Sequence, residues 1–297
     1  STSMDIKIGA TRDGRITAAT ADLRYQGGPF PGIWGMLGAM TSFACYNLPA
    51  VQSVAWDVLV NRPEVAAYRA PSAPMAAFGV ESTMDLVADA IGMDPVDFRI
   101  LNAAREGTKA NYGPTYGPIG ILPTLEAVKD HPHMKAPLGP NQGRGMACGF
   151  WFNFGGQTCT DLNISTDGTV NLTIGTVDVG GSRASMSLIA AEELGIPYDQ
   201  VKCTIGDTNS LGHNDTTEGS RGTFSSGMAT IFAARQAIDV LRERAAQKWE
   251  IPVEEVKWED GAAHAVGVMH SNLTPLTLKE IAAASPRTGG PIAGHNE

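Results

Sequence analysis

The sequence predicts an α+β fold in which helices pack on mixed or antiparallel sheets. Two alternating segments meet at Asp13-Gly14, and two more meet at Asp167-Gly168, as in β-hairpins. Apolar residues recur at helical spacing in several segments between these hairpins. The strands come as hairpins rather than as regular βαβ units, and no GxGxxG with a later acidic residue occurs, so a Rossmann fold is disfavoured.

The composition is that of an ordered chain with a sizeable core. The chain has 297 residues, of which 43% are hydrophobic and 18% are charged, and its net charge is −9. This negative charge disfavours nucleic acid as a partner. No segment approaches the roughly 20 apolar residues of a membrane span, and the start lacks a signal-peptide core, so we expect a cytoplasmic protein without a membrane partner.

The first half is expected to form one α+β subdomain, residues 4–138. In chain order we expect a hairpin, a strand, a turn-rich loop, two helices and a loop with a short helix, at residues 4–25, 50–61, 67–74, 75–91, 94–103 and 114–129. Gly92 is a typical helix stop, and Asp94 and Pro95 are typical of an N-cap and a first helical position. Residues 130–143 are rich in proline and glycine and predict a linker.

The second half is expected to form another α+β subdomain, residues 139–297. Strands are expected at residues 143–155, 158–179 and 200–208, a hairpin at 253–269 and a short helix at 276–285. Longer helices are expected to begin near Ala184 and Gly227. Residues 1–3 are expected to be an added tail. The end of the chain from Pro286 is expected to stop without a closing element, as in an excised piece.

Two glycine-rich turns before these helices are candidate ligand loops. Residues 175–195 predict a strand, a turn and a helix, in which Gly180 and Gly181 expose the main chain beside Ser182 and Arg183. Unpaired N–H groups in a first helical turn favour a phosphate. The GSR triplet recurs within residues 218–227, again before a helix. Two such loops indicate a long ligand with several polar groups, although glycine- and serine-rich turns before helices are also common without ligands.

Cysteines and histidines do not form a recognisable metal motif in the sequence. Four cysteines are scattered without CxxC spacing, and six histidines include no HExxH arrangement. His131 and His133 lie in a proline-containing loop and are expected to be solvated. We expect reduced, partly buried thiols and no metal held by protein side chains. A metal would have to arrive with a ligand.

Three ordered segments carry a family resemblance. They are AYRAPSAPMAAFGVESTMDLVADAIGMDPVDFRILN at residues 67–102, STDGTVNLTIGTVDVGGSRASMSLIAAEELGIP at 165–197, and DTNSLGHNDTTEGSRGTFSSGMA at 207–229. Together they resemble the molybdenum-cofactor subunit of the xanthine dehydrogenase/aldehyde oxidase family, over a span from Met4 to about Val268. The resemblance implies the molybdopterin-binding fold of that family, and molybdopterin cytosine dinucleotide as the cofactor.

The resemblance also implies a set of cofactor-binding residues. Those residues are Tyr68, Arg69, Ala70, Val179, Gly180, Gly181, Ser182, Arg183, Ala184, Ser220, Arg221, Thr223, Phe224, Ser225, Ser226 and Gly227. Similar proteins carry glutamine at the position of Gly181, so here contact would fall to main-chain N–H groups, Ser182 or Arg183. Carbon monoxide dehydrogenases resemble the first loop but have AYRCSFR, with a copper-binding cysteine in place of Ala70. That branch is therefore disfavoured.

The implied reaction is oxidative hydroxylation of an aldehyde or N-heterocycle, with water as the oxygen source. In the family the general base is a glutamate in a glycine-rich C-terminal motif, and no such motif precedes Glu297. We therefore expect no catalytic residue within this chain and no activity of the chain alone. The implied partners are a small-molecule substrate, an iron–sulfur subunit or domain and often a flavin subunit.

Two other classes of function remain compatible with the residues themselves. One is a phosphate- or nucleotide-binding enzyme of another class that uses both glycine loops directly. The other is a non-catalytic interaction module built on the same fold. Stabilisation of the chain by a nucleotide alone would favour the first of these classes.

Overall fold

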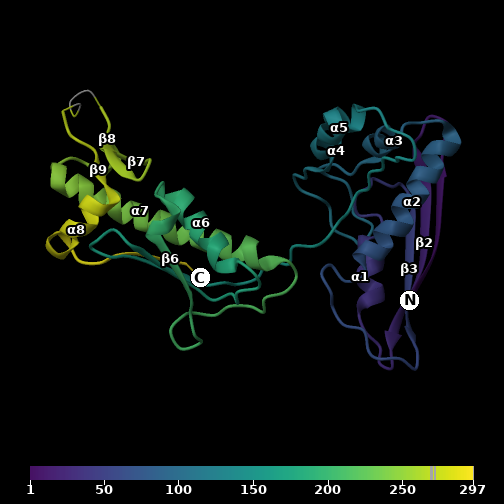
Figure 1. Ribbon diagram of the computed structural model, residues 1–297, viewed down its shortest axis with the longest axis horizontal. Helices are drawn as coiled ribbons and strands as arrows, with labels where there is room; N and C mark the ends of the chain where they lie inside the picture. The colour runs from purple at the N-terminus through teal and green to yellow at the C-terminus, as the bar shows by residue number, and fades with distance from the viewer. Residues whose placement is uncertain (268–269, 271, 297) are drawn as a thin grey trace. The chain divides into compact units, whose positions relative to one another are not determined.

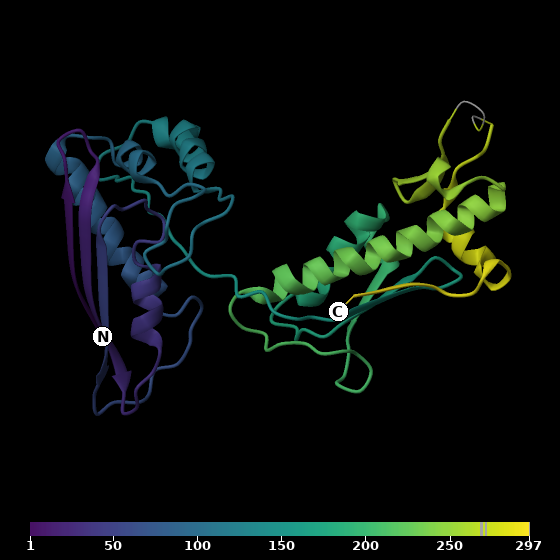
Figure 2. The same cartoon turned by 180° about the vertical axis from the view of Figure 1, so that it is seen from behind.

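The computed structural model describes residues 1–267, 270 and 272–296. The chain divides into two compact units, Ser1–Trp151 and Phe152–Glu297. In each unit helices pack on a mixed sheet, which confirms the predicted α+β class (Figure 1 and Figure 2).

The division falls after Trp151, whereas the sequence analysis places the boundary at residue 138. Residues 139–151 stay with the first unit because hydrogen bonds hold them there. The Arg144 guanidinium donates to the carbonyls of Met134 and Ala136, at 2.9 and 2.7 Å. Farther along, the N–H of Cys148 donates to a buried carboxylate in a helix of the same unit, at 2.8 Å.

The first unit contains a three-stranded sheet in the order β1 (Thr2–Ala10), β2 (Ile16–Gly28), β3 (Val51–Leu59). β1 and β2 form the predicted hairpin, with Asp13-Gly14 in the turn and a φ of 89° at Gly14. β3 runs parallel to β2, and α1 (Trp34–Thr41) is the crossover between them. α1 is not predicted from the sequence, because its glycines weaken helix propensity. Gly38 is needed there, since a Cβ would lie 2.2 Å from the Tyr25 hydroxyl.

α2 (Ala73–Ile91) packs its buried side against this sheet, with Val80 and Met84 in the same core as Leu23 of β2. The predicted stop is confirmed, because Gly92 has a φ of 71° and donates to two carbonyls of the last helical turn. The predicted N-cap is also confirmed: the Asp94 carboxylate accepts from two N–H groups of α3. The remaining helices of the unit are α3 (Pro95–Asn102), α4 (Ile121–Asp130) and α5 (Pro132–Lys135).

A buried ion pair joins α2 to α3. Arg99 is fully buried, and its guanidinium donates to Glu81 at 2.8 Å and to Asp85 at 2.7 Å. The Tyr46 hydroxyl donates to the other oxygen of the Glu81 carboxylate, at 2.5 Å. The side-chain amide of Asn102 accepts from an N–H of β2 at 2.9 Å. α2 and residues 94–102 lie within the first segment of the family resemblance. Their buried contacts show that they belong to the scaffold of the first unit.

The second unit contains a four-stranded sheet in the order β10 (Ile292–Asn296), β4 (Thr160–Ile164), β5 (Val170–Ile174), β6 (Val201–Ile205). β4 and β5 form the predicted hairpin around Asp167-Gly168. α6 (Ser182–Leu194) connects β5 to the parallel strand β6, and α7 (Gly227–Trp249) crosses the sheet over β10 and β4 (Figure 2). Leu172 and Leu241 lie in the core between this helix and the sheet.

A smaller antiparallel sheet follows α7. Its strands are β7 (Val256–Glu259), β8 (Ala262–Ala265) and β9 (Leu276–Thr277), and the short turns η1 (Tyr198–Gln200) and η3 (Val253–Glu255) precede β6 and β7. The hairpin predicted at residues 253–269 is confirmed by β7 and β8, except that residues 268–269 lie outside the described residues. α8 (Leu278–Thr288) begins with a capping box between Thr277 and Glu280.

Two expectations about the second half are wrong. Residues 143–155 contain no strand, because Cys148 donates its N–H to a carboxylate instead of a neighbouring strand. The end of the chain does have a closing element, since β10 pairs with β4 along its full length. At the other end, Thr2 and Ser3 pair with β2 as part of β1.

We expect Arg99→Met to lower the free energy of unfolding by about 3–5 kcal/mol, because the substitution leaves the Glu81 carboxylate buried without its cation. Equilibrium unfolding in urea measures this. Arg15→Met is the control, because that ion pair is exposed, and its effect should stay within about 0.5 kcal/mol. Equal effects of the two substitutions would contradict a role for the buried pair.

Candidate functional site

The second unit brings two helix N-termini to the same end. Thr230 near the start of α7 contacts Met186 of α6, with 3.7 Å between Oγ1 and Sδ. Farther along both helices, Arg235 donates to Glu193 at 2.6 Å. Residue numbers rise along both helices from the first contact to the second, so α6 and α7 run parallel. Their N-termini therefore lie side by side. The two glycine loops predicted as ligand loops precede these starts.

The first loop, residues 180–183, is called the GGSR loop. Gly180 and Gly181 have φ values of 73° and 110°, which residues other than glycine rarely adopt. Open space lies beside both glycines. Asp178 turns back onto this loop. Its carboxylate accepts from the N–H of Gly181 at 3.1 Å and from Arg183 Nε at 2.7 Å.

These contacts place a negative charge beside donors of the GGSR loop that the sequence predicts to be free. The hydrogen bond from Arg183, followed by that from the Gly181 N–H, lowers the pKa of Asp178, so the carboxylate is charged at neutral pH. The expected free donors of Gly181 and Arg183 are therefore already engaged by an anion of the chain itself. A phosphate at this loop would have to displace Asp178 or share its donors.

A buried arginine attaches the second loop, residues 218–227, to the segment at residues 155–157. Arg221 is 3% exposed and donates to the carbonyls of Gly155, Gln157 and Asp215, the last at 2.8 Å. Its guanidinium is thus used to fix the neighbouring segment rather than to face a ligand. Directly after it, η2 (Gly222–Ser226) is a π-helical turn that leads into α7. Such turns are frequent at functional sites.

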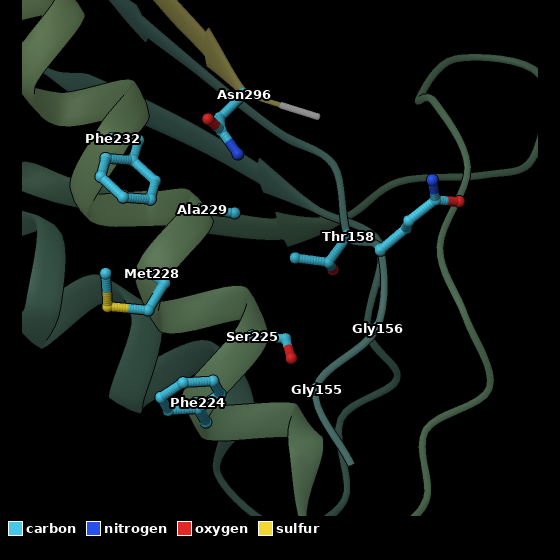
Figure 3. Close-up of a pocket in the computed structure, with 10 residues that line it drawn as sticks. Gly155, Gly156, Thr158, Phe224, Ser225, Met228, Ala229, Phe232 and Asn296 are labelled. Carbon is cyan, nitrogen blue, oxygen red and sulfur yellow. The ribbon is translucent and has the colours of Figure 1, made fainter. Parts of the chain in front are cut away.

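A cleft of about 470 Å³ opens between this turn and the segment that Arg221 holds (Figure 3). Its walls come from residues 155–158 on one side and from η2, the first turns of α7 and the end of β10 on the other. The lining residues are Gly155, Gly156, Gln157, Thr158, Phe224, Ser225, Met228, Ala229, Phe232 and Asn296. Of the predicted cofactor-binding residues, Phe224 and Ser225 line this cleft.

Ser225 carries an unsatisfied polar atom at the wall of the cleft. The residue is 7% exposed, and its Oγ has no hydrogen-bond partner among the described residues. The neighbouring Ser226 is fully buried and lies 3.4 Å from the Thr158 hydroxyl. A buried hydroxyl without a partner costs free energy, so the position is one where a ligand acceptor would be stabilising.

The other residues predicted in these two loops lie around the same end of the unit. Exposed positions are Val179, Gly180, Gly181, Arg183, Ala184, Ser220, Thr223 and Phe224, whereas Gly227 is buried at the start of α7. Ser182 is half-buried at the start of α6. Ser220 has a φ of 60° without being glycine, which is a strained conformation directly before Arg221.

The loop with Tyr68, Arg69 and Ala70 belongs to the first unit. Tyr68 is 88% exposed, and Arg69 and Ala70 have φ values of 35° and 56°. Ser72 adds a third left-handed residue, at 65°, and its carbonyl accepts from the Tyr25 hydroxyl at 3.4 Å. Such residues cost on the order of 1–3 kcal/mol each and are frequent at ligand sites.

Sequence reasoning missed the wall of the cleft at residues 155–158. Gly155 and Gly156 both have positive φ values, and a Cβ on Gly156 would lie 2.5 Å from a carboxylate oxygen of Asp215. The Gly-Gly pair followed by Thr158 was the available signal, because it repeats the pattern of glycines and a hydroxyl in the other two loops.

Within residues 1–267, 270 and 272–296, no three His, Cys, Asp or Glu side chains gather as a metal site would require. In the same part of the chain, no helix has the length and apolar character needed to cross a membrane.

Two family models match the chain, and both describe a molybdopterin cofactor-binding domain. One matches residues 1–103 and the other residues 133–296. The chain belongs to the molybdopterin cofactor-binding domain family. The predicted resemblance to the xanthine dehydrogenase/aldehyde oxidase proteins is thereby confirmed.

Relatives of this molybdopterin-binding chain have names of the same kind. It is 27% identical to the putative xanthine dehydrogenase molybdenum-binding subunit XdhA of Escherichia coli, covering 93% of this chain and 37% of that protein. It is 33% identical to the nicotinate dehydrogenase large molybdopterin subunit of Eubacterium barkeri, over 43% of this chain and 31% of the relative. The chain thus spans about a third of these relatives.

Solved structures show the same fold. Quinoline 2-oxidoreductase from Pseudomonas putida matches with a TM-score of 0.79 and 20% identity, over 99% of this chain and 42% of that one. An aldehyde oxidoreductase from Desulfovibrio desulfuricans matches with a TM-score of 0.68 and 22% identity, over 99% of this chain and 31% of that one.

We expect Asp178→Asn to strengthen binding of inorganic pyrophosphate several-fold, because it removes a negative charge that engages Gly181 and Arg183. Isothermal titration calorimetry measures this. Asp199→Asn, in η1 of the same unit, is the control for a general change in net charge. Equal gains for both variants, or a loss for Asp178→Asn, would show that Asp178 does not compete with the anion.

Proposed function

We propose that this chain is the cofactor-binding region of a molybdenum hydroxylase that oxidises an aldehyde or an N-heterocycle. Family membership and the names of the relatives support this. Those names include aldehyde oxidoreductases and a nicotine 6-hydroxylase large subunit from Paenarthrobacter nicotinovorans, which is 24% identical over 91% of this chain and 37% of its own length.

The observation that carries the proposal is the unpartnered Ser225 hydroxyl beside the cleft. It lies in the π-helical turn that begins α7, and α6 begins at the same end of the unit. A phosphorylated pterin offers acceptor oxygens for such a hydroxyl and for main-chain N–H groups. The residues present therefore fit a molybdopterin, and its cytosine dinucleotide form is proposed from the family resemblance.

The residues of this chain would bind and orient the cofactor. They would not act as the general base of the reaction. When bound, the cofactor supplies a two-electron acceptor for oxidation of the substrate carbon. Ser225 would donate to a phosphate oxygen, while Arg221 would keep the opposite wall in place through the carbonyls it binds. Tyr68 and Arg69 would position pterin or substrate. Among the described residues, those that line the cleft include no carboxylate, histidine or cysteine.

The proposal includes partner proteins. Electrons must leave the cofactor after each turnover, so an iron–sulfur subunit or domain, and often a flavin subunit, would receive them. The relatives support this because several are described as subunits. The substrate would be a small molecule with an oxidisable carbon beside nitrogen or a carbonyl.

Ser225→Ala is expected to have two opposite effects. Without ligand, removal of the unpartnered hydroxyl should raise the free energy of unfolding by about 1 kcal/mol. With ligand, loss of one hydrogen bond should weaken binding of isolated molybdopterin by about tenfold. Urea unfolding measures the first effect, and fluorescence titration with the pterin measures the second.

The control is Ser285→Ala, because Ser285 is equally buried in α8 and does not line the cleft. It should leave pterin affinity unchanged. If Ser225→Ala binds the pterin as tightly as the unchanged chain, the cleft is not the cofactor site. Tighter binding of a free nucleotide than of the pterin would instead favour a nucleotide-binding enzyme of another class.

A further inference from the structure

Two of the four thiols lie together in the first unit. Cys148 is buried in the core of that unit, and the half-buried Cys45 packs against the same core. The Glu81 carboxylate links their segments, since it accepts from the Tyr46 hydroxyl at 2.5 Å and from the N–H of Cys148 at 2.8 Å. Because Tyr46 directly follows Cys45, one carboxylate holds both cysteine-bearing segments.

The two side chains also belong to the same hydrophobic core. Interaction between the two thiols raises the pKa of Cys45 and lowers the pKa of Cys148. Burial and the Glu81 carboxylate oppose this lowering of the Cys148 pKa, whereas the Tyr46 hydroxyl and the charge of Arg99 add to it. By contrast, burial raises the pKa of Cys203, in the second unit, to about 11. Cys148 therefore has the greater thiolate character of these three thiols.

We propose that Cys45 and Cys148 are a modification site at which a hydroperoxide forms an intramolecular disulfide. The Cys148 thiolate attacks the O–O bond and becomes a sulfenic acid, while the hydroperoxide releases water or an alcohol. The sulfur of Cys45 then attacks the sulfenic sulfur. The S–S bond forms, the S–O bond breaks, and the leaving hydroxide takes the remaining proton as water. Two thiols lose two electrons in total, and the peroxide gains them.

The bond would fasten the chain just before the second unit begins. Residues 144–151 have no helix or strand and are held to the first unit by Arg144 and by the N–H of Cys148. A disulfide from Cys148 to Cys45 would make this attachment covalent and close a long loop. Closing a long loop restricts the unfolded chain, so the oxidised protein should melt at a higher temperature. Formation of this disulfide does not require the cofactor.

The test is to oxidise the purified chain with hydrogen peroxide under native conditions. Intact mass should fall by two hydrogen atoms, and the four thiols should fall to two. Proteolytic digestion without reductant should yield a single cross-linked pair of peptides, containing Cys45 and Cys148. The melting temperature should rise, and dithiothreitol should reverse each change.

Cys45→Ser and Cys148→Ser should each abolish the cross-link. Cys203→Ser is the control and should form it as the unchanged chain does, because Cys203 lies in the other unit. A gain of oxygen atoms without a cross-link would overturn the proposal, as would a disulfide through Cys159 or Cys203 or between two molecules. If either serine variant fails to fold, the peptide map of the unchanged chain decides the question.

Discussion

The parallel packing of α6 and α7 is the constraint on which the proposed site depends. Two ligand loops can serve one ligand only if the helices that follow them begin at the same end, and the contacts Thr230–Met186 and Arg235–Glu193 fix that arrangement. Close packing of α7 on the sheet maintains it. A Cβ on Gly294 of β10 would lie 1.8 Å from a main-chain oxygen of α7, so only glycine allows this approach.

The two loops at these starts differ in what they offer a ligand. At the GGSR loop, Asp178 supplies a negative charge to the donors, whereas at η2 the Ser225 hydroxyl is buried without a partner. The cleft also lies beside η2 and not beside the GGSR loop. We infer that the phosphate oxygens of a pterin belong at η2. The GGSR loop would contact an anionic part of the same ligand only where that part displaces Asp178 or shares its donors.

Features that depend on neighbours in the sequence could be predicted, and those that depend on distant contacts could not. The Asp-Gly hairpins, the stop at Gly92 and the cap at Asp94 arise from local backbone preferences. The pairing of β10 with β4 and the use of Arg221 to hold residues 155–157 join segments far apart in the chain. The glycine-rich turns before the two helices predicted both loops, but only the structure separates scaffold residues such as Arg99 from residues at the cleft.

Hydrogen–deuterium exchange of the chain with and without isolated molybdopterin tests the central claim most directly. The account predicts that the pterin slows exchange in residues 155–158, 179–184 and 220–227 together, because both helix starts and the cleft wall contact one ligand. Slower exchange in only one of these segments, or only elsewhere in the second unit, would contradict a single site shared by α6 and α7.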